Sequence, residues 1–250
     1  MTKQIVILLG LLSGCIPAAS AAGIETPHVV WDVTFNGQPL DAAPWCMSKE
    51  QLEKFNTAGD LSWTPLKTCC SLTYVTRTRQ AKVVKEAAGL MDTPLLFTYT
   101  EGAQPNWGPQ VRFTVPPELA SRAKKWKLSL DVSKGTVTIS GGLTVWDVVG
   151  IDFTESGAVR VGDAEVAHYV PNKPLHIDCE INVPEKTVRV IFDGAPSKTV
   201  SVAWHQPKAA SFSSLRLDGL LPGGHAEAPG SIAFDNIRLT LVETLKQERP

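Results

Sequence analysis

Apolar and polar residues alternate over long stretches of this chain. From Ile177 to Val183 every second residue is apolar, and the residues between them are Asp, Glu and Asn. A second alternating run extends from Val188 to Phe192, and Asp193-Gly194 follows it as a turn signal. A period of two is typical of strands with one buried face. The two runs therefore predict neighbouring antiparallel strands.

Short strand patterns of this kind recur along most of the chain, with turn signals roughly every 8–12 residues, as in all-β sandwiches. We therefore predict an all-β fold, a two-sheet antiparallel β-sandwich (jelly roll) with one or two short helices. A capping box at Ser48 to Gln51, with Gly59 as a stop signal, predicts one helix. The segment 80–91 fits either helical spacing or a strand extension. The predicted strands are 28–35, 72–79, 94–100, 110–115, 125–132, 136–139, 145–153, 159–161, 164–169, 177–183, 188–192, 215–219 and 230–239.

One domain accounts for the whole pattern. Residues 27–243 are expected to form a single sandwich, because the apolar faces of the first strands need a partner sheet, and 244–250 is a polar tail. Alternation assigns a set of large side chains to the shared core. They are Trp126, Leu128, Ile151, Phe153, Ile177, Ile181, Val190 and Phe192. Trp31 and Trp204 also share faces with aliphatic residues and are expected in the core.

The order of motifs in the second half resembles the concanavalin A-like lectin and glucanase superfamily, which includes laminin G-like jelly rolls. The resemblance covers about 125–242 and rests on four motifs in this order. They are Tyr169-Val170-Pro171, Lys186-Thr187-Val188, Leu215-Arg216-Leu217-Asp218-Gly219 and Phe234-Asp235-Asn236-Ile237. It implies two packed antiparallel sheets and, as in many members, a polysaccharide or cell-surface glycan as partner. Related chains often carry a Trp where Leu175-His176 stands here.

The first residues have the character of a targeting segment. Lys3 precedes the apolar run Ile5–Leu12, and Ala19-Ser20-Ala21 offers a cleavage site, so 1–21 is predicted to be a signal peptide. Leu12-Ser13-Gly14-Cys15 also resembles a bacterial lipobox, which would end the leader at residue 14 and place a lipid on Cys15. We expect an exported protein, periplasmic, extracellular or lipid-anchored at the cell envelope. Any membrane attachment is expected only through that lipid.

Charge excludes one class of partner. The chain has 24 Lys and Arg against 25 Asp and Glu, and no block of like charges. Nucleic-acid binding is therefore not expected, because it needs a basic footprint. For the same reason a bound glycan is expected to be neutral or weakly charged.

Four cysteines follow the leader: Cys46, Cys69, Cys70 and Cys179. In an exported chain they are candidates for disulfides, with three possible connectivities. Adjacent strand positions point to opposite faces, so Cys69 and Cys70 are expected to pair with other residues. The alternative for Cys179, which shares an apolar face, is a buried free thiol.

Asp235 is the one candidate metal ligand. It falls in phase with Ile237, Leu239 and Leu241, and a carboxylate facing a core needs a cation or several N–H donors. Structural calcium is therefore a possible cofactor, although calcium needs six to eight oxygen ligands. The alternatives are a β-bulge that turns Asp235 outward, or a backbone cap.

Two tryptophans are candidates for ligand binding. Trp107 stands in a turn-rich loop with Asn106 and Gln104, and Trp146 is out of phase with the apolar residues of its strand. An exposed ring can stack on the apolar face of a sugar while nearby amides bind its hydroxyl groups. The alternative is that each ring folds back over the edge of the sandwich.

No catalytic pattern is complete. Asp178 and Glu180 share a strand face, as paired carboxylates of glycosidases do, but the third acid of the related glucanases is absent. The five histidines are scattered. The sequence therefore predicts a non-catalytic carbohydrate-binding or cell-surface module. The alternatives are a diverged glycoside hydrolase or polysaccharide lyase of the same fold, and a structural surface protein without a small ligand.

Overall fold

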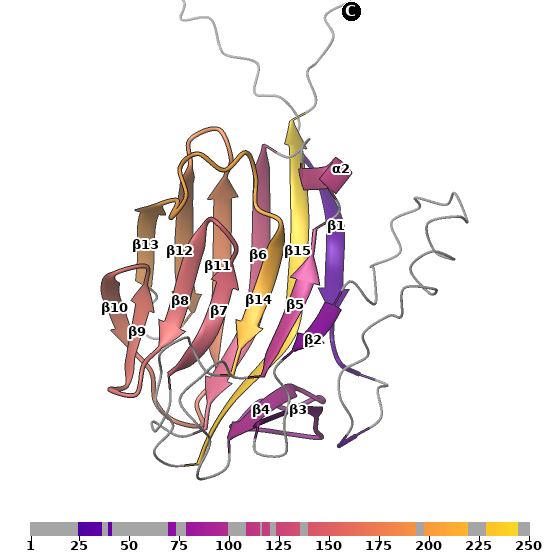
Figure 1. Cartoon of the computed structure of the whole chain (residues 1–250), viewed down its shortest axis with the longest axis vertical. Coiled ribbons are helices and arrows are strands. Elements are labelled where there is room, and N and C mark those ends of the chain that lie inside the picture. Colours follow the sequence, from indigo (N-terminus) through magenta and orange to yellow (C-terminus); the bar gives the residue numbers. More distant parts are fainter. Residues whose placement is uncertain are drawn as a thin grey trace, which may run out of the picture.

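Two antiparallel sheets lie face to face and form a β-sandwich (Figure 1). The computed structural model of the chain describes residues 25–36, 40–41, 70–73, 79–99, 109–115, 117–120, 124–135, 140–193, 198–219 and 229–244. The predicted fold class is confirmed. The sheet nearer the viewer in Figure 1 is called the front sheet below, and the other is called the back sheet.

The back sheet has eight strands within the described ranges, in the order β13-β12-β11-β6-β15-β4-β3, with β1 also paired to β15. Its long central strands are β6 and β15, and β15 runs the full height of the sandwich in Figure 1. The bounds are β1 Glu25–Val33, β3 Arg79–Val83, β4 Leu95–Tyr99, β6 Lys125–Lys134, β11 Leu175–Asn182, β12 Thr187–Asp193, β13 Lys198–Ala203 and β15 Gly230–Thr244.

The front sheet has seven strands within the described ranges, in the order β10-β9-β8-β7-β14-β5-β2. A single turn of helix, α2 (Pro117–Ala120), follows β5. The strand bounds are β2 Cys70–Thr73, β5 Gln110–Thr114, β7 Gly141–Val145, β8 Val149–Phe153, β9 Ala158–Val161, β10 Ala164–His168 and β14 Ser214–Asp218.

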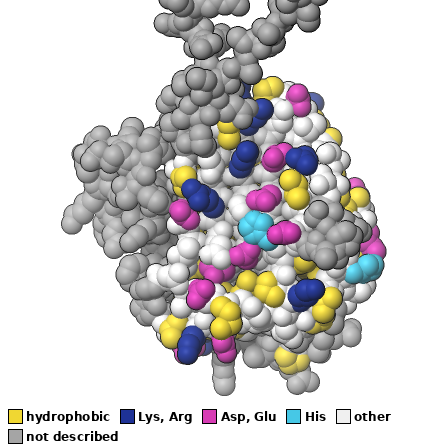
Figure 2. Space-filling view, turned by 180° about the vertical axis from the view of Figure 1, so that it is seen from behind, with side chains coloured by type: hydrophobic (Ala, Val, Ile, Leu, Met, Phe, Trp, Pro, Cys, Tyr) yellow, Lys and Arg dark blue, Asp and Glu magenta, His cyan; other side chains and the backbone are white. Residues whose placement is uncertain are grey.

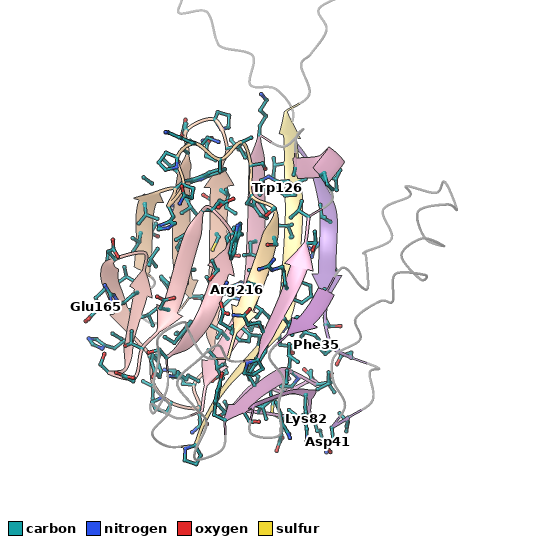
Figure 3. The ribbon with its side chains drawn as sticks, in the orientation of Figure 1. Phe35, Asp41, Lys82, Trp126, Glu165 and Arg216 are labelled. Carbon is teal, nitrogen blue, oxygen red and sulfur yellow. The ribbon has the colours of Figure 1, made fainter. Side chains whose placement is uncertain are left out.

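The core lies between the sheets and consists of the side chains that the alternation assigned to it. All eight predicted core residues, Trp126 to Phe192, are at most 3% exposed, and Trp204 is buried with them. Trp126, labelled in Figure 3, packs edge-on against Phe212 with ring centroids 5.0 Å apart. The described ranges contain no helix long and apolar enough to cross a membrane.

Two sequence predictions need correction in detail. The predicted strand 145–153 is two strands, β7 and β8, joined by a turn in which Asp147 has φ +69°. Asp tolerates this left-handed conformation better than most residues, and the alternation alone does not reveal it. The ambiguous segment 80–91 continues as strand β3 and then turns at Ala88 and Gly89. The helix predicted at 48–59 lies outside the described residues, as does the side chain of Trp31.

A bulge in β15 changes which residues face the core. Before it, Phe234 pairs with the inward-facing Val132 of β6, and after it Leu239 pairs with the inward-facing Leu128. The pairing shifts between Asp235 and Arg238, and Asn236 adopts φ +51° there. One extra residue reverses the inside-outside phase of a strand. The bulge therefore keeps apolar residues inward along both halves of β15.

Lys134 is the one lysine among the described residues that is buried, at 1% exposure. Its Nζ lies 3.4 Å from the carbonyl oxygen of Phe153 and 5.4 Å from the ring centroid of Tyr169. Burial lowers the pKa of the ammonium from 10.5 to about 8, and Glu155 opposes this only in part. The ammonium therefore reduces the stability of the fold while it remains protonated.

We expect Lys134→Met to stabilise the protein more at pH 7 than at pH 10. Below about pH 8 the lysine is protonated in both states, whereas between about 8 and 10.5 the unfolded chain binds more protons, so the parent gains stability as pH rises. The full effect is on the order of 3 kcal/mol.

Denaturant unfolding of both proteins at several pH values measures this difference. Burial raises the pKa values of Cys179 and Tyr169 to about 12, and both residues are present in both proteins, so their effect on the pH dependence is common to the two. A difference in stability that stays constant from pH 7 to 10 would contradict the burial argument.

Candidate functional site

Trp146 presents an aromatic ring on the outer face of the front sheet. The residue follows β7 directly, and its N–H donates to the carbonyl of Ser214 at 2.9 Å, so it continues the β7–β14 ladder. Its side chain is 37% exposed, whereas most large apolar side chains in the described ranges are buried. The structure thus places Trp146 outward, as its sequence phase predicted.

Two arginines lie against this ring. The guanidinium carbon of Arg112 is 5.0 Å from the ring centroid and that of Arg216 is 5.3 Å from it. Arg112 and Arg216 are directly opposite in the β5–β14 register. A cation over an indole face is attracted by the ring electrons. The contact therefore fixes the orientation of Trp146 and gathers positive charge beneath an exposed aromatic surface.

Strand register arranges the other polar residues of this face in two rows across the sheet. Directly paired residues share a face, because side chains alternate along each strand. One row holds Arg112, Arg216, Thr144 and Gly150, and the next holds Gln110, Asp218, Gly142, Asp152 and Arg160.

The centre of the second row is a buried ion pair. Asp218 is fully buried, and its Oδ2 accepts from Arg216 Nε at 2.8 Å and from Thr144 Oγ1 at 3.4 Å. Figure 3 labels Arg216 near the middle of the front sheet. The side chain of Gln110, which stands opposite Asp218 in the register, also favours the charged carboxylate.

The carboxyls of this face hold protons more tightly than exposed acids do. Burial raises the pKa of Asp152 to about 6, the nearby Asp218 adds to the shift, and Arg160 and Arg216 oppose it. Burial also raises the pKa of Asp218, against the pull of Arg216. Gly150 leaves the face open, since a side chain there would meet only the Asp152 carboxylate at 3.6 Å.

Sequence reasoning located part of this arrangement. It identified Trp146 but not Arg112, Arg216 or Asp218, which have no local motif and meet only through the β5–β14–β7 pairing. The Arg-x-Asp spacing in β14 places both side chains on one face and was the available signal. The other predicted ligand-binding residues, Trp107, Asn106 and Gln104, lie outside the described residues.

The outer face of the back sheet is polar and carries the carboxylates first considered for glycoside hydrolysis. Figure 2 shows this face, with histidine and acidic side chains gathered near its middle. Glu180 accepts from Arg189 at 3.0 Å, and Asp178 lies 3.5 Å from His176 Nε2. Each carboxylate therefore has its own positive or titratable partner. The arrangement is that of a solvated strand face rather than a paired acid site.

The β15 pairing places Asp235 on the outer side of the back sheet, one of the open alternatives, yet the residue is only 1% exposed. It stands opposite Asp131 in the register, and its Oδ1 accepts from the N–H of Asn236 at 2.8 Å. Burial raises its pKa to about 6, and the charges of Asp131 and Asp92 raise it further against the Asn236 hydrogen bond. No three His, Cys, Asp or Glu residues in the described ranges gather to hold a metal ion. Calcium at Asp235 therefore stays a prediction.

Cys179 is a buried free thiol, so its candidacy for a disulfide was wrong. It faces the core with its neighbours on β11, and burial raises its pKa to about 12. Cys15, Cys46 and Cys69 lie outside the described residues, and only the backbone of Cys70 is described. Disulfides that involve Cys46, Cys69 or Cys70 remain a prediction.

Comparison with known proteins bears on the fold alone. No protein-family model matches the sequence, and no curated protein matches it significantly. Among solved structures, a sialidase is similar with a TM-score of 0.52 and 14% identity, over 68% of this chain and 17% of that chain.

Two further structures are more distant. Lectin I from Ulex europaeus, in complex with the methyl glycoside of α-L-fucose, has a TM-score of 0.45 and 10% identity, over 70% of this chain and 92% of that chain. The binding domain of botulinum neurotoxin serotype D/C has a TM-score of 0.46 and 9% identity, over 71% of this chain and 44% of that chain. This chain therefore spans less than half of the sialidase and of the toxin domain.

We expect Asp235→Asn to raise the melting temperature at pH 7.5 in the presence of a chelator and to change it little at pH 4. The raised pKa means that ionisation above about pH 6 reduces stability, and Asn keeps the hydrogen bond from Asn236 without the charge. Calorimetry at both pH values measures this.

The same experiment tests calcium. If chelation lowers the melting temperature of the parent but not of Asp235→Asn, the predicted metal is present. If chelation changes neither, calcium at this position is rejected.

Proposed function

We propose that the chain is an exported carbohydrate-binding module of the concanavalin A-like type, and that its glycan site is non-catalytic. Its site is the outer face of the front sheet around Trp146. The observation that carries the proposal is an exposed indole ring set among fixed hydrogen-bonding groups. Sugars need this combination, since their C–H faces stack on rings and their hydroxyl groups take polar partners.

The alternative of a structural surface protein predicts a smooth face without exposed aromatics. Trp146 argues against that alternative, because it is partly exposed and held by two guanidinium groups. Beside it, Thr144, Gly150 and Asp152 form a rim that is neither fully buried nor crowded. A bound sugar would rest on the ring and reach this rim.

The charge beneath the ring favours glycans that carry a carboxylate. Arg112 is only partly buried, and Arg160 is exposed at the other end of the site. A guanidinium fork binds a planar carboxylate through two parallel hydrogen bonds. The expectation of a neutral glycan came from the absence of a basic cluster in the sequence, and folding brings the arginines together. We therefore propose uronic or other acidic sugars as ligands.

The rival hydrolase has one observation in its favour. Asp152 and Asp218 occupy the same row of the face, separated by Gly142, so their Cα atoms are roughly 10 Å apart. A carboxyl with a pKa of about 6 suits a general acid. However, Asp218 is fully buried and bonded to Arg216, so it offers no carboxylate to a substrate. Binding without bond cleavage fits this geometry better.

We expect Trp146→Ala to weaken glycan binding by about 1 kcal/mol or more, which is roughly fivefold in Kd. A glycan array identifies the ligand, and calorimetric titration measures the affinity. Trp146→Tyr should retain most of it, because a ring remains. Met91→Ala is the matched control, since Met91 is an exposed apolar residue outside the site.

Unchanged affinity in Trp146→Ala, with an unchanged melting temperature, would reject the site. Release of reducing or unsaturated ends from a polysaccharide by the parent, lost in Asp152→Asn, would establish the enzyme instead.

We expect Arg112→Gln to reduce affinity for carboxylated glycans at least fivefold and affinity for neutral glycans much less, because Arg216 still contacts the Trp146 ring. The affinity of the parent for acidic glycans should fall as salt is raised from about 50 to about 500 mM, because salt screens exposed charges. This range changes the Debye length roughly threefold. Arg189→Gln on the opposite sheet is the control. Equal losses for neutral and acidic glycans would show that Arg112 acts on the fold and not on a carboxylate.

A further inference from the structure

A second cluster lies on the other outer face of the sandwich, on β6 and β11 of the back sheet. Ser129 Oγ is 3.0 Å from Nε2 of His176, and Nδ1 of the same imidazole is 2.6 Å from Oδ1 of Asp131. A hydroxyl, an imidazole and a carboxylate in this order have the connectivity of nucleophilic serine sites.

The sheet register explains their meeting. Leu128, Leu130 and Val132 face the core, so Ser129 and Asp131 both project outward from β6. In the adjacent strand His176 pairs directly with Asp131. The imidazole thus stands beside the two β6 side chains, with one nitrogen toward each.

We propose that Ser129 is the nucleophile of an esterolytic site, with His176 as its general base and Asp131 as the residue that positions the imidazole. The substrate class is a carboxylic ester of a polar alcohol. This site is separate from the glycan site proposed on the front sheet and does not depend on it.

A further contact holds the carboxylate in place. Asn236 Nδ2 donates to Asp131 Oδ2 at 2.7 Å, which leaves Oδ1 for the imidazole. Asn236 reaches this position because the β15 bulge gives it φ +51°. The Asp131 carboxylate is held on one side by the Asn236 amide and accepts a hydrogen bond from Nδ1 of His176 on the other. His176 therefore adopts the tautomer that carries its hydrogen on Nδ1. Nε2 is then free to accept a proton from Ser129.

Arg238 supplies positive charge on the other side of the nucleophile. It pairs with Ser129 in the β6–β15 register and is exposed on the same face. Directly opposed side chains have Cβ atoms about 4.5–5.5 Å apart. The backbone N–H groups of a sheet interior are engaged in the ladder, so the cation is the candidate for stabilising an oxyanion.

A groove of about 430 Å³ lies further along β6, β11 and β12, and the three residues of the cluster are not part of its lining. Its lining includes Lys127, Glu180 and Arg189. Lys127 is two residues from Ser129 along β6, a spacing of about 7 Å. A polar ester would have to extend from the groove past Lys127 to bring its carbonyl to the hydroxyl.

The chemistry balances with water as the only co-reactant. Ser129 Oγ bonds to the ester carbonyl carbon as its proton passes to His176 Nε2. The carbon–alkoxide bond then breaks, and the alcohol leaves with that proton. Water attacks the acyl-serine and gives one proton to Nε2, which returns it to Oγ as the acid is released.

The state of His176 sets the pH at which the site works. Burial opposes protonation, but hydrogen bonds and charge from Asp131 and Asp178 outweigh it and raise the pKa of the imidazole. Asp178 Oδ1 is 3.5 Å from Nε2 and competes with Ser129 for it. Asp193 of β12 also pairs with His176, and Arg238 lies beyond Ser129. General-base activity therefore appears only above the raised pKa.

The test uses the full chain with a fluorophosphonate probe and with p-nitrophenyl acetate. We expect stoichiometric labelling of Ser129, located by peptide mass spectrometry, and ester hydrolysis with a burst of nitrophenol. Ser129→Ala should lose both. Ser213→Ala is the control, because Ser213 is an exposed serine that belongs neither to the cluster nor to the groove. Melting temperatures establish that each variant is folded.

Asp131→Asn tests the positioning role separately. We expect the labelling rate to fall at least tenfold and the midpoint of its pH profile to move to lower pH, because the charge that raises the pKa of His176 is gone. A purely structural role would leave that midpoint unchanged. Failure of the probe to label the parent, labelling at another residue, or full hydrolysis by Ser129→Ala would each overturn the proposal.

Discussion

The inward alternation of apolar residues in the back sheet is the constraint on which the rest of the structure depends. Leu128, Leu130 and Val132 in β6 oppose Cys179, Ile177 and Leu175 in β11, so a slip by one residue would turn the apolar face of the slipped strand toward water. Burial of this face fixes the register, and the register fixes which polar residues become neighbours outside. The packing of the core therefore determines which polar side chains lie next to each other on the outer faces.

The fold was predictable because alternation is a local signal. The predicted core residues from Trp126 to Phe192 are buried, and the two-sheet architecture is confirmed. Local signals failed where single residues change the backbone direction. Asp147 ends β7 within a continuous apolar pattern, and Asn236 reverses the phase of β15, so that Asp235 was assigned to the wrong face.

The candidate sites were less predictable than the fold, since their members are distant in sequence. Trp146 was found from its phase, but Arg112 and Arg216 are brought to it by pairing of β5, β14 and β7. Similarly, Ser129 and His176 are 47 residues apart and no spacing rule joins them. Strand order is set by the global packing of the two sheets, which one sequence does not reveal.

The two outer faces carry different chemistry. The front face joins an aromatic ring to buried and partly buried arginines, and its carboxyls are drawn toward neutrality by burial. The back face is open and strongly polar, and its histidine is surrounded by acids. The thickness of the core separates these environments, so each can vary in composition without altering the other.

The bulge at Asn236 limits how the length of β15 can change. Because it alone converts one phase of β15 into the other, removing a single residue there would exchange inside for outside along half of the strand. Evolution can therefore replace side chains throughout this strand, but it has almost no freedom to change the strand's length.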